Sequence, residues 1–127
     1  MSTIFSKIIN GEIPSYKVYE DDHVYAFLDV NPMHPGHTLV VPKKEVEYIF
    51  DLDIEDYQKL MNGVNIVSKL LKSKLNCLKI GLVVDGYLAP HVHVHLIPTN
   101  GPHEINESLQ KEAKKEDLEN IYKKLTS

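Results

Sequence analysis

Three histidines stand at alternate positions in the segment 91–97, with apolar residues between them. A β-strand repeats its side-chain direction every two residues. As a strand, this segment therefore presents His91, His93 and His95 on one face and its apolar residues on the other. A row of three imidazoles backed by an apolar face indicates a chemical site rather than ordinary core packing.

Two chemistries use histidines at this spacing. A His-x-His pair on a strand can present two ligands to zinc, and His37 or Asp85 could complete such a site. Alternatively, one imidazole acts as a nucleophile while its neighbours donate protons and stabilise charge. Histidine suits phosphorus chemistry at neutral pH because its ordinary pKa is about 6.5. The central residue, His93, is then the natural nucleophile. The spacing leaves both chemistries open and favours phosphoryl or nucleotidyl transfer.

The composition indicates an ordinary globular protein. The chain has 127 residues, of which 25% are charged and 43% hydrophobic, and its net charge is −4. We therefore expect one domain over residues 1–127 and no nucleic-acid partner held by a basic surface. Cys77 is the only cysteine, so no intrachain disulfide forms. The absence of a long apolar run predicts no membrane partner, and we expect a cytoplasmic protein.

The periodicity predicts an α+β fold with a mostly antiparallel sheet, one long helix and short helices near both termini. Asp51 or Asp53 is expected to cap the long helix, which ends near residues 75–76. Asp85-Gly86 resembles a hairpin turn. The expected helices cover residues 4–9, about 53–75 and part of a C-terminal extension over about 107–127, and the expected strands cover residues 16–20, 24–28, 37–41, 78–84 and 91–97.

Residues 91–97 read His-φ-His-φ-His-φ-φ, where φ is apolar, and this resembles the signature of the histidine triad (HIT) superfamily. Segments 4–14, 25–30 and 36–44 look like the Hint branch of that superfamily. The resemblance covers residues from about 3 to 98. It implies the HIT-like fold, a homodimer that joins two sheets, and an enzyme without a cofactor. Such enzymes bind a nucleotide, usually a purine nucleotide, and cleave a bond at its α-phosphorus.

The resemblance also implies roles for individual residues. His93 would be the nucleophile that forms a nucleotidyl-imidazole intermediate, and His95 would contact the phosphate and the leaving group. His91 would orient and polarise the row, with His37 beside it. Asp29 would accept hydrogen bonds from the ribose hydroxyls, since a carboxylate is an acceptor only. The apolar base pocket would be formed by Ile4, Phe5, Ile8, Phe27, Leu28 and Val30.

Two features depart from the pattern of the Hint branch. Many bacterial relatives have a structural zinc site, but its cysteine and histidine positions hold Thr3, Ser6 and Glu45 here. Because hydroxyls are poor zinc ligands, we predict no structural zinc.

The phosphate-binding loop differs as well. Asp85 stands near the position of an asparagine, and Leu88 replaces a polar residue. Backbone N–H groups from Gly86 to Ala89 would still cradle the phosphate. A carboxylate near a phosphate is repulsive, so this loop leaves the choice of leaving group open.

The leading hypothesis is a nucleoside phosphoramidate hydrolase of the Hint type, acting on a purine nucleotide conjugate. A dinucleoside polyphosphate hydrolase resembling the Fhit branch is the alternative among metal-free enzymes. A nucleotide-binding regulatory protein with incidental turnover is a different class. A zinc hydrolase built on the histidine segment is the weakest of the four.

Overall fold

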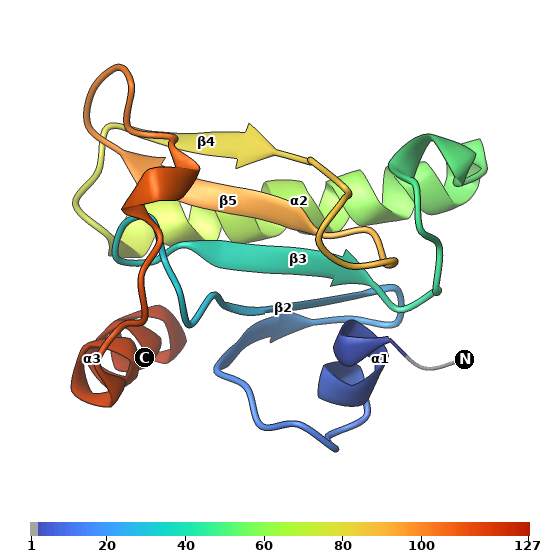
Figure 1. The fold of residues 1–127 in the computed structure, drawn as a ribbon, viewed down its shortest axis with the longest axis horizontal. Coiled ribbons are helices and arrows are strands. Elements are labelled where there is room, and N and C mark those ends of the chain that lie inside the picture. The colour runs from blue at the N-terminus through green and yellow to red at the C-terminus, as the bar shows by residue number, and fades with distance from the viewer. Residues whose placement is uncertain (1–2) are drawn as a thin grey trace.

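The computed structural model describes residues 3–127 and contains one antiparallel sheet of five strands in the order β1-β2-β3-β5-β4 (Figure 1). This confirms the predicted α+β fold. The predicted bounds of β1, β3 and β4 are correct to within one residue, and those of α1 and β2 agree with the structure. In chain order the elements are α1 (Ile4–Ile9), β1 (Lys17–Glu20), β2 (Val24–Leu28), β3 (Thr38–Pro42), the 3-10 turn η1 (Ile49–Asp51), α2 (Ile54–Lys74), β4 (Lys79–Val83), β5 (Val94–Thr99), the 3-10 turn η2 (Glu107–Leu109) and α3 (Lys115–Thr126).

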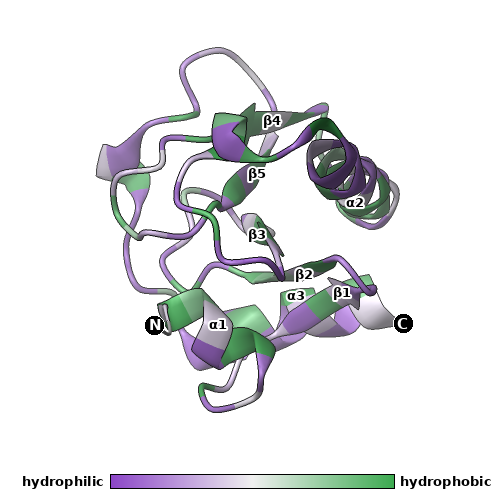
Figure 2. Ribbon diagram, turned by 90° about the vertical axis from the view of Figure 1, so that its right-hand side faces the viewer, coloured by the Kyte–Doolittle hydropathy of each residue, from purple (hydrophilic) through white to green (hydrophobic). Residues whose placement is uncertain are grey.

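The long helix α2 covers one face of the sheet (Figure 2). Its buried residues Leu60, Val64 and Val67 pack against alternate side chains of the strands, as the helical spacing predicts. Gly63 allows a close approach to β2, because a Cβ there would lie 2.6 Å from Cγ2 of Val24. Helix α2 therefore packs directly on the sheet, and its contacts extend to β5, the strand that carries His95.

Capping defines both ends of α2. The side chain of Asp53 accepts a hydrogen bond from the N–H of Asp56 at 2.8 Å, so Asp53 is the N-cap. The other predicted candidate, Asp51, ends η1 instead. The helix ends with Leu75 as its C-cap, at the predicted position.

The opposite face of the sheet carries a second apolar cluster, and α1 packs there. The rings of Phe5 and Phe27 lie 6.0 Å apart in this cluster. The members of the cluster are Phe5, Ile8, Tyr25, Phe27, Leu39 and Val41. The histidines lie on this face, because Val92, Val94 and Leu96 belong to the core on the α2 side.

The histidine segment is less regular than predicted. We expected a strand over residues 91–97, but β5 begins only at Val94. The N–H of Val92 donates to the carbonyl oxygen of Val46 at 2.7 Å, so this part of the chain bonds to the connection after β3 instead of joining a ladder. The predicted alternation of direction is nevertheless kept, since Val92 and Val94 are both fully buried in the core.

Strands β4 and β5 are antiparallel neighbours, with Val83 opposite His95. The predicted turn at Asp85-Gly86 is part of a longer connection over residues 84–93. Gly86 has a φ of 86°, in the left-handed region that favours glycine.

The chain after β5 crosses the sheet before it forms α3. The N–H of Ala113 donates to the carbonyl oxygen of Val30 at 3.0 Å, which ties this segment to the loop after β2. Helix α3 packs against α2 and β1, where the rings of Tyr16 and Tyr122 lie 5.8 Å apart. Helix α3 therefore adds to the core on the α2 side, while the segment that leads to it runs beside the loop after β2.

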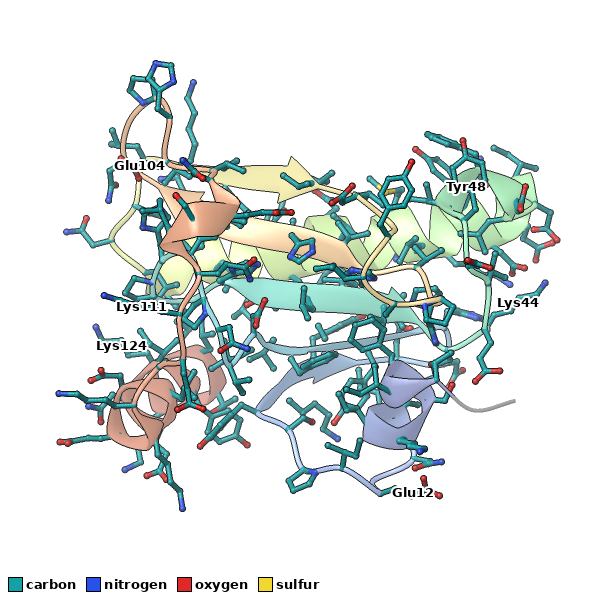
Figure 3. The ribbon with its side chains drawn as sticks, viewed as in Figure 1. Glu12, Lys44, Tyr48, Glu104, Lys111 and Lys124 are labelled. Carbon is teal, nitrogen blue, oxygen red and sulfur yellow. The ribbon has the colours of Figure 1, made fainter. Side chains whose placement is uncertain are left out.

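Charged side chains project from the periphery, as Lys44, Glu104, Lys111 and Lys124 show in Figure 3. Within residues 3–127, no helix combines the length and the apolar character needed to span a membrane.

Candidate active site

The three histidines of the row are joined by a fourth, His37, which directly precedes β3. The ring centroids of His93 and His95 lie 5.2 Å apart, and those of His37 and His95 are also 5.2 Å apart. The sheet register pairs Leu39 with His95, which brings the start of β3 to this end of the row. His37 thus lies beside the row, as expected, and its neighbour is His95, at the end of the row opposite His91.

Two hydrogen bonds, one from a backbone N–H and one from a side chain, fix which nitrogen carries the proton in His37 and in His95. The N–H of Met33 donates to Nδ1 of His37 at 3.0 Å, so Nε2 of the neutral His37 ring carries the hydrogen. This Nε2–H donates to Nδ1 of His95 at 2.9 Å. The proton of the neutral His95 ring is consequently on Nε2. His95 is thus prepared as a hydrogen-bond donor on its remaining nitrogen.

The opposite arrangement is found in His93. Its Nδ1 lies 2.8 Å from the carbonyl oxygen of His91, and a carbonyl only accepts, so Nδ1–H is the donor. The lone pair of the neutral His93 ring is therefore on Nε2. The ring is 3% exposed and packs against Phe5, with 5.0 Å between centroids. The neighbouring rings thus present two complementary groups, a lone pair on Nε2 of His93 and an N–H on Nε2 of His95.

His91 closes the other end of the row. Its Nε2–H donates to the carbonyl oxygen of Pro42 at 2.7 Å, and its Nδ1 accepts from the hydroxyl of Thr3 at 2.8 Å. The carboxylate of Glu45 accepts hydrogen bonds from the side chain of Ser6 and from the N–H of Thr3. Thr3, Ser6 and Glu45 therefore meet at His91 and form a hydrogen-bonded network that joins α1 to the row.

Burial keeps the outer rings of the site neutral at pH 7. It lowers the pKa of His37 to about 3 and that of His95 to about 4, because a charged imidazole loses its hydration there. Burial also lowers the pKa of His91. The proton positions assigned to His37, His91 and His95 belong to neutral rings, and the lowered pKa values of these three residues support that assignment.

Asp29, His37 and His95 bring one potential ligand atom each to within 4.8 Å of one another. Nε2 of His37, however, carries a hydrogen because its Nδ1 accepts the N–H of Met33. A metal ligand needs a free lone pair on that atom. The donor set as arranged does not fit a metal ion, which disfavours the zinc hydrolase hypothesis.

Asp29 lies at the end of β2 with 13% of its side chain exposed. Burial raises the pKa of its carboxyl, while the N–H of Asn31 donates to Oδ1 at 2.9 Å. Nε2 of Gln110 contacts Oδ2 at 3.3 Å and donates to the carbonyl oxygen of Asn31 at 2.9 Å. A side chain of the C-terminal segment thus occupies one face of the carboxylate expected to bind ribose. Asp29 also borders a cavity of about 630 Å³ beside α3.

The structure groups only some of the residues expected to form the base pocket. Phe5, Ile8 and Phe27 share the apolar cluster under α1. Ile4 is 53% exposed and Val30 is 49% exposed. Leu28 points to the other face of the sheet and packs in the core below α2, so the structure does not bring it into this group.

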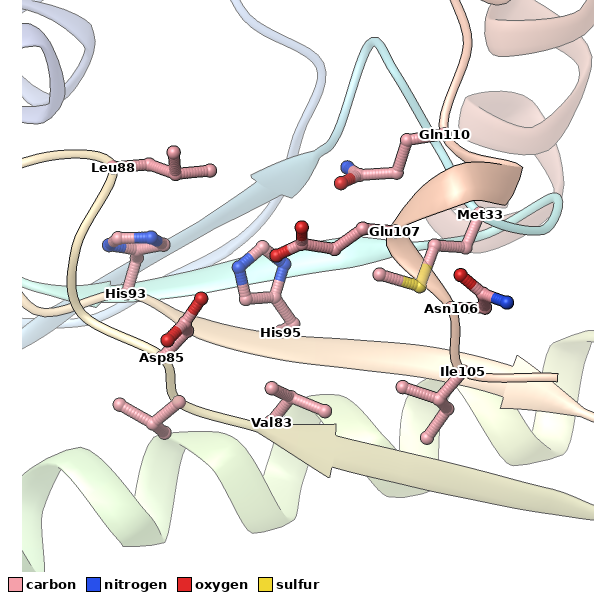
Figure 4. A pocket seen from close by; sticks show the side chains of 11 residues that line it. Met33, Val83, Asp85, Leu88, His93, His95, Ile105, Asn106, Glu107 and Gln110 are labelled. Atoms are coloured by element: carbon pink, nitrogen blue, oxygen red, sulfur yellow. The ribbon is translucent and has the colours of Figure 1, made fainter. Parts of the chain in front are cut away.

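A second cavity, of about 250 Å³, opens beside His93 and His95 (Figure 4). Asp85 and Leu88 border it, Gly86 lies in the same connection, and Ala89 packs against the apolar cluster under α1. The opposite wall comes from the C-terminal segment, which sequence reasoning left unassigned. Its residues at the cavity are Ile105, Asn106, Glu107 and Gln110.

Comparison with known proteins gives consistent matches. The HIT domain matches residues 10–101. An uncharacterised HIT-like protein of Methanocaldococcus jannaschii is 47% identical over 100 residues, which cover 75% of this chain and 77% of that protein. The purine nucleoside phosphoramidase of Escherichia coli is 35% identical over 107 residues, covering 75% of this chain and 85% of the enzyme. The crystal structure of a Hit-like protein involved in cell-cycle regulation from Bartonella henselae superposes with a TM-score of 0.87 at 35% identity, covering 98% of this chain and 94% of that one.

Proposed function

Because this chain belongs to the HIT family, whose members include nucleotide-binding hydrolases, we propose that it hydrolyses nucleoside phosphoramidates, with a purine nucleotide as the expected substrate moiety. The observation that carries the proposal is the lone pair on Nε2 of His93 beside the N–H of His95, at the wall of one cavity. The similarity to the Escherichia coli phosphoramidase supports this choice of reaction.

In the first step, Nε2 of His93 attacks the α-phosphorus and forms a P–N bond. The bond from phosphorus to the leaving amine breaks, and its electron pair stays on the amine nitrogen. Nε2–H of His95 supplies the proton that this nitrogen takes up, and His37 holds His95 in the required tautomer. This transfer leaves His95 as an imidazolate, whose negative charge balances the positive charge of the nucleotidyl-imidazolium formed at His93. Proton donation of this kind contributes a factor of about 100 to 10,000 in rate.

In the second step, water attacks the same phosphorus and displaces His93. The deprotonated Nε2 of His95 accepts the proton of that water, which restores both rings. The products are the free amine and a nucleoside monophosphate. The hydrogen bond from Nδ1 of His93 to the carbonyl oxygen of His91 stabilises the ring while it carries the nucleotidyl group.

The nucleotide would be held by groups around this row. Asp29 accepts hydrogen bonds from the ribose hydroxyls, which replace the amide of Gln110 on its Oδ2. The base lies against the apolar side chains near α1, where Phe5 already packs on His93. Backbone N–H groups from Gly86 to Ala89 bind the phosphate oxygens.

Turnover of an adenosine phosphoramidate and of a diadenosine polyphosphate, measured in parallel with purified protein, tests this proposal. We expect turnover of the phosphoramidate and a loss of several orders of magnitude in His93→Ala. Faster turnover of the polyphosphate would favour a Fhit-like hydrolase. Nucleotide binding with an equal, negligible rate in both proteins would favour a regulatory nucleotide-binding protein.

The proposal includes a homodimer and a cytoplasmic location. Strand β4 lies at the edge of the sheet, and the large apolar side chains of Leu78 and Leu82 are exposed on or next to it. An edge of this kind is suited to pairing with a second copy of the chain. Sedimentation equilibrium tests the dimer, and a monomer at micromolar concentration would contradict it.

A further inference from the structure

The cavity beside His93 and His95 has two carboxylates on its walls. Asp85 follows the end of β4, and Glu107 belongs to η2, so they come from distant parts of the chain. In Figure 4 the side chain of Glu107 extends toward His95, and that of Asp85 lies next to both histidines. Carboxylates therefore border the part of the cavity beyond the reactive nitrogens on two sides.

No cationic side chain offsets these carboxylates. Lysine and arginine are absent from the described residues that line the cavity. Across residues 3–127, neither Asp85 nor Glu107 makes an ion pair. Burial lowers the pKa of His95 and the charge of Asp85 acts in the opposite direction, so this carboxylate is within electrostatic range of the site. Two like charges without a counterion favour a cation between them.

We propose that Asp85 and Glu107 select phosphoramidates whose leaving amine carries a second, positively charged group. This inference rests on the proposed phosphoramidate hydrolysis and names the class of leaving group. The apolar walls at Val83 and Ile105 accommodate the chain that joins the two amino groups.

The distal cation takes no part in bond making. When His93 attacks, the phosphorus–nitrogen bond breaks, and the proximal nitrogen keeps the electron pair and gains the proton of His95. The distal ammonium stays charged and pairs with Asp85 and Glu107 throughout. An anionic leaving group, such as a polyphosphate or a carboxylate-bearing amine, meets repulsion at the same place.

Three adenosine phosphoramidates of similar length test the selection. Their leaving amines are cadaverine, which keeps a distal ammonium; hexylamine, which is neutral beyond the reacting nitrogen; and aminovalerate, which ends in a carboxylate. We expect kcat/KM to fall in that order, with at least about a tenfold difference between the cadaverine and aminovalerate conjugates. High salt should reduce the difference.

The doubly substituted variant Asp85→Asn/Glu107→Gln removes both charges while keeping the shape of each side chain. Its ratio of kcat/KM for the cadaverine and aminovalerate conjugates should fall to within about threefold. Glu116→Gln/Asp117→Asn is the matched control, because it also removes two acidic charges, both from α3 and away from the cavity. The ratio in this control should equal that of the unmodified protein.

The outcomes separate the inference from the proposed function. Turnover of all three conjugates that depends on His93, with equal kcat/KM or with aminovalerate preferred, overturns the inference and leaves phosphoramidate hydrolysis intact. A ratio that survives in the doubly substituted variant also overturns it. Failure to hydrolyse any of the three conjugates overturns both.

Discussion

The hydrogen bond from Nε2–H of His37 to Nδ1 of His95 is predicted to position the proton that reaches the leaving group. His37→Phe removes this donor while keeping a ring of similar size. Without it, the proton of His95 can move to Nδ1, where it no longer faces the substrate. In contrast, His37→Gln places an amide N–H close to the position of the lost Nε2–H, and serves as the matched control.

The magnitude follows from the energy of one hydrogen bond. A neutral bond of this type contributes about 0.5–1.5 kcal/mol, and about 1.4 kcal/mol corresponds to a tenfold change in rate. We therefore expect kcat of His37→Phe to fall about tenfold, with KM changed less than about twofold, because the contact matters in the transition state. His37→Gln should retain kcat to within about threefold.

The assay follows release of a fluorescent amine from an adenosine phosphoramidate under saturating and limiting substrate. Circular dichroism and thermal unfolding verify that each variant folds. Equal kcat in His37→Phe and the unmodified protein would refute the positioning role. Equal losses in His37→Phe and His37→Gln would show that the imidazole is needed for packing and not for its N–H.

Three further predictions concern stability and binding. Gly63→Ala should lower the free energy of unfolding by about 1–2 kcal/mol in urea titrations. Overpacking of the new methyl group against Val24 costs more than the helix propensity of alanine gains. A neutral or stabilising result would contradict the close approach of α2 to β2. Burial lowers the pKa of His37 to about 3, so below pH 6.5 the unfolded state binds more protons at this residue than the folded state does. The free energy of unfolding should therefore fall as the pH drops from about 7 toward 4, by about 1–2 kcal/mol for this group after solvent screening. A pH dependence that is undiminished in His37→Gln would count against this origin. Gln110→Glu puts a second carboxylate beside Asp29 and should weaken the binding of adenosine monophosphate about tenfold in calorimetric titrations. Unchanged affinity would contradict the proposal that Asp29 binds the ribose.

Local periodicity was sufficient to predict most of the fold. The three- and four-residue steps along α2 reflect a single apolar face. The unbroken apolar run of β2 reflects burial on both faces of the strand, one against each apolar cluster. Asp53 could be identified as a candidate N-cap because the hydrogen bond that a capping side chain accepts comes from a backbone N–H only three residues later. Patterns of this kind depend only on neighbouring residues, so the sequence carries them directly.

Long-range contacts were the part that sequence patterns could not supply. The start of β5 depends on a hydrogen bond between Val92 and Val46, and the partner of His37 depends on strand register. Gln110 reaches Asp29 across a separation of 81 residues, from a segment with no periodic signal. The chemistry of the row was predictable from residue types, whereas the walls of its cavity required the folded chain.

The most direct measurement is the mass of the protein after rapid mixing with an adenosine phosphorimidazolide, whose leaving imidazole ring is protonated by solvent and needs no proton from His95. His95→Asn should slow the attack of water, since His95 accepts the proton in the second step. We predict an adenylyl adduct that accumulates in this variant, maps to His93 in peptide sequencing and is absent from His93→Ala/His95→Asn. An adduct on another residue, or hydrolysis that persists in His93→Ala at the unmodified rate, would contradict covalent catalysis by His93.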